Sequence, residues 1–196
     1  MAEEKAIFII PGYRQRPTQK AYRQLAQILK AEGYHPILVS IPWANTTISQ
    51  NAEFFLKKLS RSKATEKYIL GFSYGAMIAL VASTRVKTDG LILCSLSPYF
   101  SEDLTTKKTP KTKLMQKRYE DFTKMQCSEL SSKVKTNKVL LLYGQEEAAV
   151  LVNRVKTAFG QVKTKKKYLI KVAGAEHEIG NKNYLSTIHF ASKTIL

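Results

Sequence analysis

The chain has 196 residues and is 44% hydrophobic, which is typical of one globular domain and excludes a disordered chain. Lysine and arginine number 32 and aspartate and glutamate 15, so the net charge is +17, and such a surface attracts phosphates, acidic lipids or anionic substrates. Two cysteines give no disulfide framework, and no apolar run approaches the roughly 18 residues that a membrane span requires.

The first ten residues, MAEEKAIFII, carry glutamates where a secretory signal would be basic. Their apolar run is only about as long as a strand. Cys94 and Cys127 fit a reducing compartment. We therefore expect a soluble, cytoplasmic protein.

Short apolar runs alternate with amphipathic segments along the chain. Strands are predicted over residues 6–10, 36–41, 67–70, 90–94, 139–143 and 168–172. Helices are predicted over 18–32, with Thr18 as N-cap, and over 48–59, 74–84, 148–159 and 184–195. Nearly continuous apolar strands in this alternation favour an α/β fold, a three-layer α/β/α sandwich around a mainly parallel six-stranded sheet. Such sheets hold their reacting groups on the loops at the carboxyl ends of the strands.

The interval between Cys94 and Lys138 is longer than a single crossover needs. Helical spacing of apolar and aromatic side chains returns within it, from Leu114 to Phe122. One interpretation is a small lid or insertion over about 98–136, since long loops are often functional. The other is one ordinary crossover helix with a long surface loop. In either case residues 1–196 are expected to form one domain.

The pentapeptide GFSYG, Gly71 to Gly75, lies where a predicted strand turns into a predicted helix. A serine hydroxyl is a poor nucleophile at neutral pH, so it needs a base, a group that orients the base, and donors for the oxyanion. A tight strand-to-helix turn lifts the serine above the sheet edge, and small flanking residues leave room for the turn. The motif therefore predicts a nucleophile elbow at Ser73. The structural alternative is a tight turn in which Ser73 only caps the helix.

His177 is the best of the three histidines for the role of base. It lies in AGAEHEIG, after the last predicted strand and before the last predicted helix, where it can meet Ser73 at the carboxyl edge. His35 opens a strand near the far edge of the sheet, and His189 lies inside the last helix. Both are expected to be structural or surface residues.

The acid that orients His177 should follow the preceding strand, where the chain reads GQEE. A carboxylate there can accept the Nδ1–H of the histidine and leave Nε2 free for Ser73. Glu146 and Glu147 are both candidates. Either of them can instead be a helix-start carboxylate that the helix dipole favours.

Two backbone N–H groups are expected to stabilise the oxyanion. One belongs to Tyr74, directly after the serine, and the other to Tyr13, in the turn of IIPGY that follows the first predicted strand. This chemistry requires no metal or other cofactor, and none is expected.

Four motifs, IIPGY, LGFSYGA, LLYGQEE and AGAEHEIG, follow one another in an order that makes the chain resemble the α/β-hydrolase family over nearly its whole length. The resemblance implies Ser73 as nucleophile and His177 as base. It implies Glu147 as acid, because family members often carry the acid three residues after the glycine that ends that strand, here Gly144.

The chain departs from the family's pattern in three ways. The family usually begins with two further antiparallel strands, so a minimal version of the fold that lacks them is expected. The oxyanion turn often has His-Gly and here has Pro11-Gly12, which keeps the donors of Tyr13 and Tyr74 but changes how the turn is braced. The acid is more often aspartate, whereas only glutamates are available here.

The resulting hypothesis is a serine hydrolase, a carboxylesterase or thioesterase, that cleaves a small-molecule ester or thioester through an acyl-enzyme on Ser73. Four aromatic side chains in nearby loops are candidates for an acyl pocket: Trp43, Phe72, Tyr99 and Phe100. Phe72 and Tyr99 can equally pack in the core. The basic surface suits an anionic substrate.

A hypothesis of a different class is a non-catalytic binding module for an anionic partner, with a vestigial triad. The presence of all three acid and base residues argues against it. Lysine clusters such as Lys163 to Lys167 raise nucleic-acid binding as a third hypothesis. Because the chain lacks an arginine-rich arm or an aromatic-interleaved module, a nucleic acid is not the expected partner.

Overall fold

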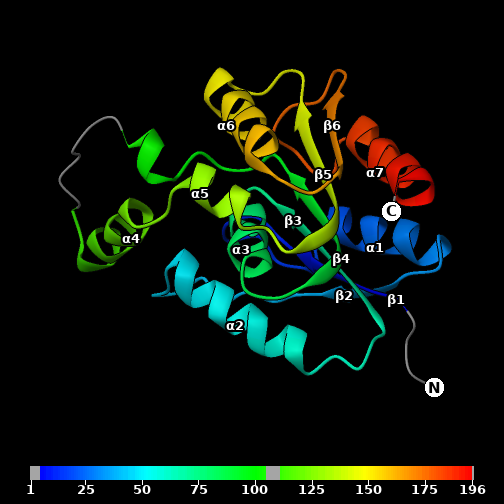
Figure 1. Cartoon of the computed structure of the whole chain (residues 1–196), viewed down its shortest axis with the longest axis horizontal. Coiled ribbons are helices and arrows are strands. Elements are labelled where there is room, and N and C mark those ends of the chain that lie inside the picture. The colour runs from blue at the N-terminus through cyan, green and yellow to red at the C-terminus, as the bar shows by residue number, and fades with distance from the viewer. Residues whose placement is uncertain (1–4, 105–110, 196) are drawn as a thin grey trace.

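The computed structural model describes residues 5–104 and 111–195, and its centre is a six-stranded sheet. The strand order is β2-β1-β3-β4-β5-β6, and every neighbouring pair is parallel (Figure 1). The strands are β1 (Lys5–Ile10), β2 (His35–Leu38), β3 (Glu66–Phe72), β4 (Thr88–Cys94), β5 (Thr136–Gly144) and β6 (Lys166–Val172). The six predicted strands are therefore confirmed, with ends that differ by a few residues.

Side chains that alternate along each strand give the sheet two apolar faces. On β1, Phe8 and Ile10 face one side and Ile7 and Ile9 the other. The first face is covered by α2 (Ile48–Ser60), α3 (Tyr74–Ser83) and α6 (Ala149–Gln161). The second is covered by α1 (Lys20–Ala31) and α7 (Lys182–Thr194), which lie together in Figure 1. This arrangement is the predicted three-layer sandwich.

The predicted cap of the first helix is wrong. Thr18 lies in a turn with its neighbours, and α1 begins only at Lys20, with Gln19 as an extended N-cap residue whose side chain makes no capping bond. Cys94 and Cys127 are both unpaired and buried. None of the helices within the described ranges combines the length and hydropathy needed to traverse a bilayer.

The described part of the long interval after β4 contains three helical elements. These are η1 (Ser101–Asp103), α4 (Lys113–Thr123) and α5 (Cys127–Ser132). The lysine- and threonine-rich stretch 105–110 lies outside the described residues. α5 packs against α6, while α4 meets the start of α2, where Asp121 Oδ2 accepts a 3.0 Å hydrogen bond from Ser49 N. The interval thus holds more than one crossover helix.

Candidate active site

Ser73 lies at the sharp turn between β3 and α3. Its backbone has φ 57° and ψ −118°, a conformation that L-residues rarely adopt and that costs about 1–3 kcal/mol. The Ser73 N–H donates to Cys94 O at 2.9 Å, which ties the turn to the end of β4. Ser73 is the N-cap residue of α3 by position, but its side chain makes no capping bond, so its hydroxyl is not used for capping.

Two glycines make this turn possible. A Cβ atom on Gly71 would lie 2.3 Å from Gly75 O, and one on Gly75 would lie 2.2 Å from Ile10 O. Both contacts are with backbone, which cannot move aside as a flexible side chain can. The two glycines let α3 pack directly on the ends of β1 and β3, and so keep Ser73 at the sheet edge.

We expect Gly75→Ala to lower the free energy of unfolding by at least about 3 kcal/mol, because its methyl group would overlap Ile10 O. Gly160→Ala is the matched control, since a Cβ at that position in α6 meets nothing within 4 Å. Replacing a helical glycine by alanine there should stabilise the protein by about 0.5–1 kcal/mol. Urea unfolding of both variants measures the difference, and equal stability of the two would contradict this account of the elbow.

Ser73, His177 and Glu147 converge from three loops at the carboxyl edge of the sheet. Nε2 of His177 lies 2.9 Å from Ser73 Oγ, and Nδ1 lies 3.6 Å from Glu147 Oε1. The Glu147 side chain is 0% exposed and that of His177 36%. Glu146, by contrast, is exposed. The geometry therefore places Glu147, and not Glu146, behind the imidazole.

Backbone pairing between the loops after β5 and β6 brings the acid to the histidine. Gln145 N donates to Val172 O, and Glu146 N donates to Ala175 O, both at 2.9 Å. A Cβ atom on Gly144 would lie 2.2 Å from Ala175 O, so only glycine permits this approach. The two loops are held together as a continuation of the parallel sheet.

Three hydroxyl groups that we did not predict complete the polar cluster. Ser97 Oγ lies 2.9 Å from Ser73 Oγ, Ser95 Oγ donates to Glu147 Oε1, and the Tyr184 hydroxyl lies 2.7 Å from Ser95 Oγ. The sequence carried one usable signal, because SLS follows directly after the strand that neighbours the elbow strand. Tyr184 offered none, since a tyrosine in an amphipathic helix is usually a packing residue.

The turn after β1 leaves one N–H group free for an oxyanion. The Gly12 N–H donates to Gln15 Oε1 at 3.1 Å and to the Tyr22 hydroxyl at 2.9 Å, so it is already used. Burial raises the pKa of the Tyr22 phenol, which therefore stays protonated and donates to Gln15 Oε1. In the described part of the chain, no acceptor is bonded to the backbone N–H of Tyr13 or Tyr74. These are the two donors that we predicted.

A cavity of about 430 Å³ opens beside Ser73 and His177. Its wall combines polar groups of Gln15, Ser73, Ser97 and His177 with aromatic and aliphatic side chains, which include Tyr13, Phe72, Tyr74, Tyr99, Val150 and Leu151. The Phe72 ring lies 5.0 Å from the His177 ring between centroids, and Phe72 is itself buried. Phe72 and Tyr99 thus lie where the predicted pocket residues belong.

The other two predicted pocket residues lie elsewhere. Phe100 is fully buried in the core, where the Arg154 guanidinium lies 5.5 Å from the centre of its ring. Phe100 directly follows Tyr99, but the chain turns between them so that only Tyr99 reaches the cavity. Trp43 lines a separate void of about 10 Å³ next to Tyr13 and Tyr74.

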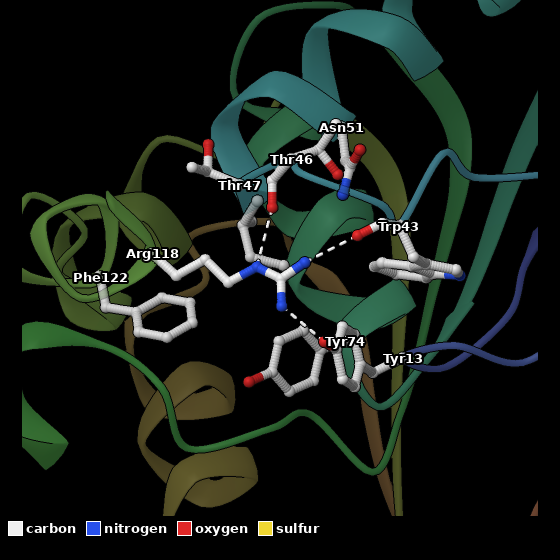
Figure 2. A pocket seen from close by; sticks show the side chains of 9 residues that line it. Tyr13, Trp43, Thr46, Thr47, Asn51, Tyr74, Arg118 and Phe122 are labelled. Atoms are coloured by element: carbon white, nitrogen blue, oxygen red, sulfur yellow. Dashed lines mark hydrogen bonds between the residues drawn. The ribbon is translucent and has the colours of Figure 1, made fainter. Parts of the chain in front are cut away.

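Arg118 of α4 points into that small void (Figure 2). Its guanidinium donates to Thr46 O at 2.9 Å, to Trp43 O at 2.7 Å and to the Tyr13 hydroxyl. It also lies 5.0 Å from the centre of the Tyr13 ring, at cation–π distance. α4 is thereby attached to the same tyrosine whose backbone faces the site.

Neither of the remaining histidines takes part in the cluster. His189 lies on the surface of α7 with Nε2 2.8 Å from Glu32 Oε1, and His35 begins the edge strand β2. Within residues 5–104 and 111–195, no group of three or more His, Cys, Asp or Glu side chains is placed to hold a metal ion.

No protein-family model and no curated protein matches the chain by sequence. Solved structures match it in fold. Est1E from Butyrivibrio proteoclasticus, also solved with ferulic acid bound, has a TM-score of 0.81 at 15% identity, with 98% of this chain and 87% of Est1E covered. Alpha/beta hydrolase domain-containing protein 10 from mouse has a TM-score of 0.73 at 17% identity, with 97% and 89% covered. The Paleococcus ferrophilus monoacylglycerol lipase has a TM-score of 0.71 at 14% identity, with 97% and 93% covered.

Proposed function

Since the chain has the α/β-hydrolase fold, we propose that it is a serine hydrolase that cleaves a small-molecule ester or thioester. The observation that carries this proposal is the 2.9 Å contact between His177 Nε2 and Ser73 Oγ, made from a serine with positive φ. A strained backbone that aims a hydroxyl at an imidazole is typical of a nucleophile and has no evident packing role.

The steps follow from the positions of the groups. Ser73 Oγ attacks the carbonyl carbon while its proton passes to His177 Nε2, and the negative charge of the tetrahedral intermediate faces the N–H groups of Tyr13 and Tyr74. Return of the proton to the leaving oxygen or sulfur breaks the bond and leaves an acyl group on Ser73. Water, deprotonated by the same imidazole, then releases the carboxylic acid. Glu147 orients the ring and stabilises its charged form.

The cavity favours an apolar acyl group. Its wall offers the rings of Tyr13, Tyr74 and Tyr99, with Tyr74 5.1 Å from Tyr13 and 5.0 Å from Tyr99 between centroids. A volume of about 430 Å³ is within the range of small-molecule sites. The names of similar structures, an esterase solved with ferulic acid and a monoacylglycerol lipase, are consistent with ester substrates.

We further propose that residues 98–136 act as a lid over this cavity. Pro98 and Tyr99 form part of its wall, and Arg118 attaches α4 to Tyr13. Both contacts link the interval directly to the site, as a lid requires.

A fluorophosphonate probe separates the enzyme from a binding module that keeps only the fold. The probe forms a covalent bond with an activated serine, so we expect labelling of Ser73 and of no other residue. Labelling should disappear in His177→Ala, which keeps the serine but removes its base. A folded wild-type protein that stays unlabelled would favour the non-catalytic module.

The net charge of +17 predicts a preference for anionic substrates at low salt. Lowering the ionic strength from about 0.15 M to about 0.01 M extends the Debye length from roughly 8 Å to roughly 30 Å. We therefore expect kcat/KM to rise for p-nitrophenyl hemisuccinate, which is anionic, and to stay nearly constant for neutral p-nitrophenyl butyrate. Steady-state assays of both esters across this range of ionic strength test the preference for anionic substrates. An equal change of kcat/KM for the two esters would contradict it.

A further inference from the structure

Glu147 receives a hydrogen bond that the triad does not account for. Its side chain is 0% exposed, and the Ser95 hydroxyl donates to Oε1, the oxygen that also faces His177. The second oxygen, Oε2, is buried and has no hydrogen-bond partner among the described residues. Burying a carboxylate is costly unless its oxygens are hydrogen-bonded, so the Ser95 bond is a main support of this side chain apart from the histidine.

The Ser95 hydroxyl is itself in contact with a second hydroxyl, that of Tyr184. The Tyr184 oxygen lies 2.7 Å from Ser95 Oγ, and both residues are 0% exposed. Because the Ser95 proton goes to the carboxylate, Ser95 Oγ accepts at this contact and Tyr184 donates. Burial raises the pKa of the Tyr184 phenol, which keeps its proton available. The order of donation is therefore Tyr184 to Ser95 to Glu147.

The backbone at Ser95, like that at Ser73, has a positive φ. Its φ is 51°, a value that favours glycine, and its N–H donates to Leu142 O at 2.9 Å. Strain of this kind costs about 1–3 kcal/mol and persists where the surrounding structure requires it. The folded chain keeps this costly conformation at the residue whose hydroxyl contacts Glu147. We therefore regard the contact as a specific feature of the site.

We propose that Tyr184 and Ser95 are positioning residues that hold Glu147 Oε1 toward His177 Nδ1 and thereby keep the imidazole aligned with Ser73. This inference rests on the proposed serine-hydrolase function. We call the hydrogen bonds from Tyr184 through Ser95 to Glu147 the relay. Its residues come from α7, the loop after β4 and the loop after β5, so it connects the acid to elements that precede and follow the histidine loop in the chain. Without it the carboxylate is free to rotate, and the 3.6 Å contact to Nδ1 is lost.

The test measures Tyr184→Phe and Ser95→Gly. We expect kcat for a p-nitrophenyl ester to fall about 10- to 100-fold with KM nearly unchanged, because neither residue lines the cavity and a misalignment near 1 Å costs a factor of this order. Glycine tolerates the positive φ of Ser95, so relief of that strain should offset part of the stability lost with the hydroxyl, and Ser95→Gly should stay folded while kcat falls. Non-additivity is also expected, since Tyr184→Phe should have little further effect once Ser95 is glycine.

Tyr34→Phe is the matched control. Tyr34 is buried against the same face of the sheet, and its hydroxyl reaches only Ser192 O, at 3.4 Å. It should leave kcat unchanged. The proposal would be overturned if kcat fell equally in Tyr34→Phe and Tyr184→Phe, or if kcat were unchanged in Tyr184→Phe.

A second readout does not depend on turnover. A low-field proton NMR signal from the His177 Nδ1–H, which faces Glu147 Oε1 at 3.6 Å, should be present in the wild type and weakened or lost in Tyr184→Phe. A signal that survives unchanged in Tyr184→Phe overturns the relay. A signal that responds as expected in a protein without esterase activity would instead support the relay and count against the proposed function.

Discussion

Replacing Ser73, the proposed nucleophile, should abolish ester hydrolysis. In Ser73→Ala we expect kcat to fall by about 10⁶-fold, because the hydroxyl that forms the acyl-enzyme is gone and only binding and the oxyanion donors remain. The measurement is steady-state hydrolysis of a p-nitrophenyl ester, with the unfolding temperature recorded in parallel. Alanine at φ 57° keeps the strain of the turn, so the fold should be retained.

Ser83→Ala is the control for this experiment. Ser83 is a fully buried serine at the end of α3, the helix that follows the elbow, and its hydroxyl bonds only to Leu80 O, at 2.8 Å. Its removal should leave kcat unchanged. Full turnover in Ser73→Ala would refute the assignment of the nucleophile, whatever the fold.

The largest effect after that is expected at the acid. In Glu147→Gln, kcat should fall by about 10⁴-fold, since an amide cannot stabilise the charged imidazole and can hold it in the wrong tautomer. The adjacent Glu146→Gln changes the same chemical group by the same step at an exposed position that does not contact His177. It should retain wild-type kcat.

This pair of neighbours decides which glutamate serves as the acid. Both variants lose one negative charge, so any general electrostatic effect on the basic protein is the same in each. A larger loss in Glu146→Gln than in Glu147→Gln would mean that the loop after β5 rearranges when substrate binds. Comparable losses would mean that neither carboxylate acts specifically on the imidazole.

The site combines a strained turn with a buried polar chain, and the two have different physical requirements. The turn at Ser73 depends on close backbone packing, for which glycines suffice. The series of hydrogen bonds from Tyr184 through Ser95 to Glu147 depends on complete hydrogen bonding away from water, where a missing donor is costly. Removing a hydroxyl from this hydrogen-bonded series is therefore expected to lower both activity and stability, whereas replacing a glycine of the turn should lower stability first.

Much of the fold was predictable because it follows from local patterns. Apolar runs such as those of β1 and β5 can only be buried strands in a chain that alternates them with amphipathic helices. The parallel order of the sheet then places every strand's carboxyl end on one edge. That geometry was enough to select Ser73 and His177, since Ser73 directly follows β3 and His177 lies in the loop between β6 and α7.

The sequence by itself predicted the sheet, the strand-to-helix turn at Ser73 and the choice of His177, because these depend on the identity of residues and their order. The tertiary structure showed that Glu147, which the family resemblance already favoured, lies against the imidazole while Glu146 does not. Only the tertiary structure separated Tyr99 from Phe100 and joined Ser95 and Tyr184 to Glu147. The reason is that neighbouring residues in a loop point in different directions. Which of them reaches the site depends on backbone turns and on hydrogen bonds to strands distant in sequence, such as the bond from Glu146 N to Ala175 O. No periodicity in the chain encodes those contacts.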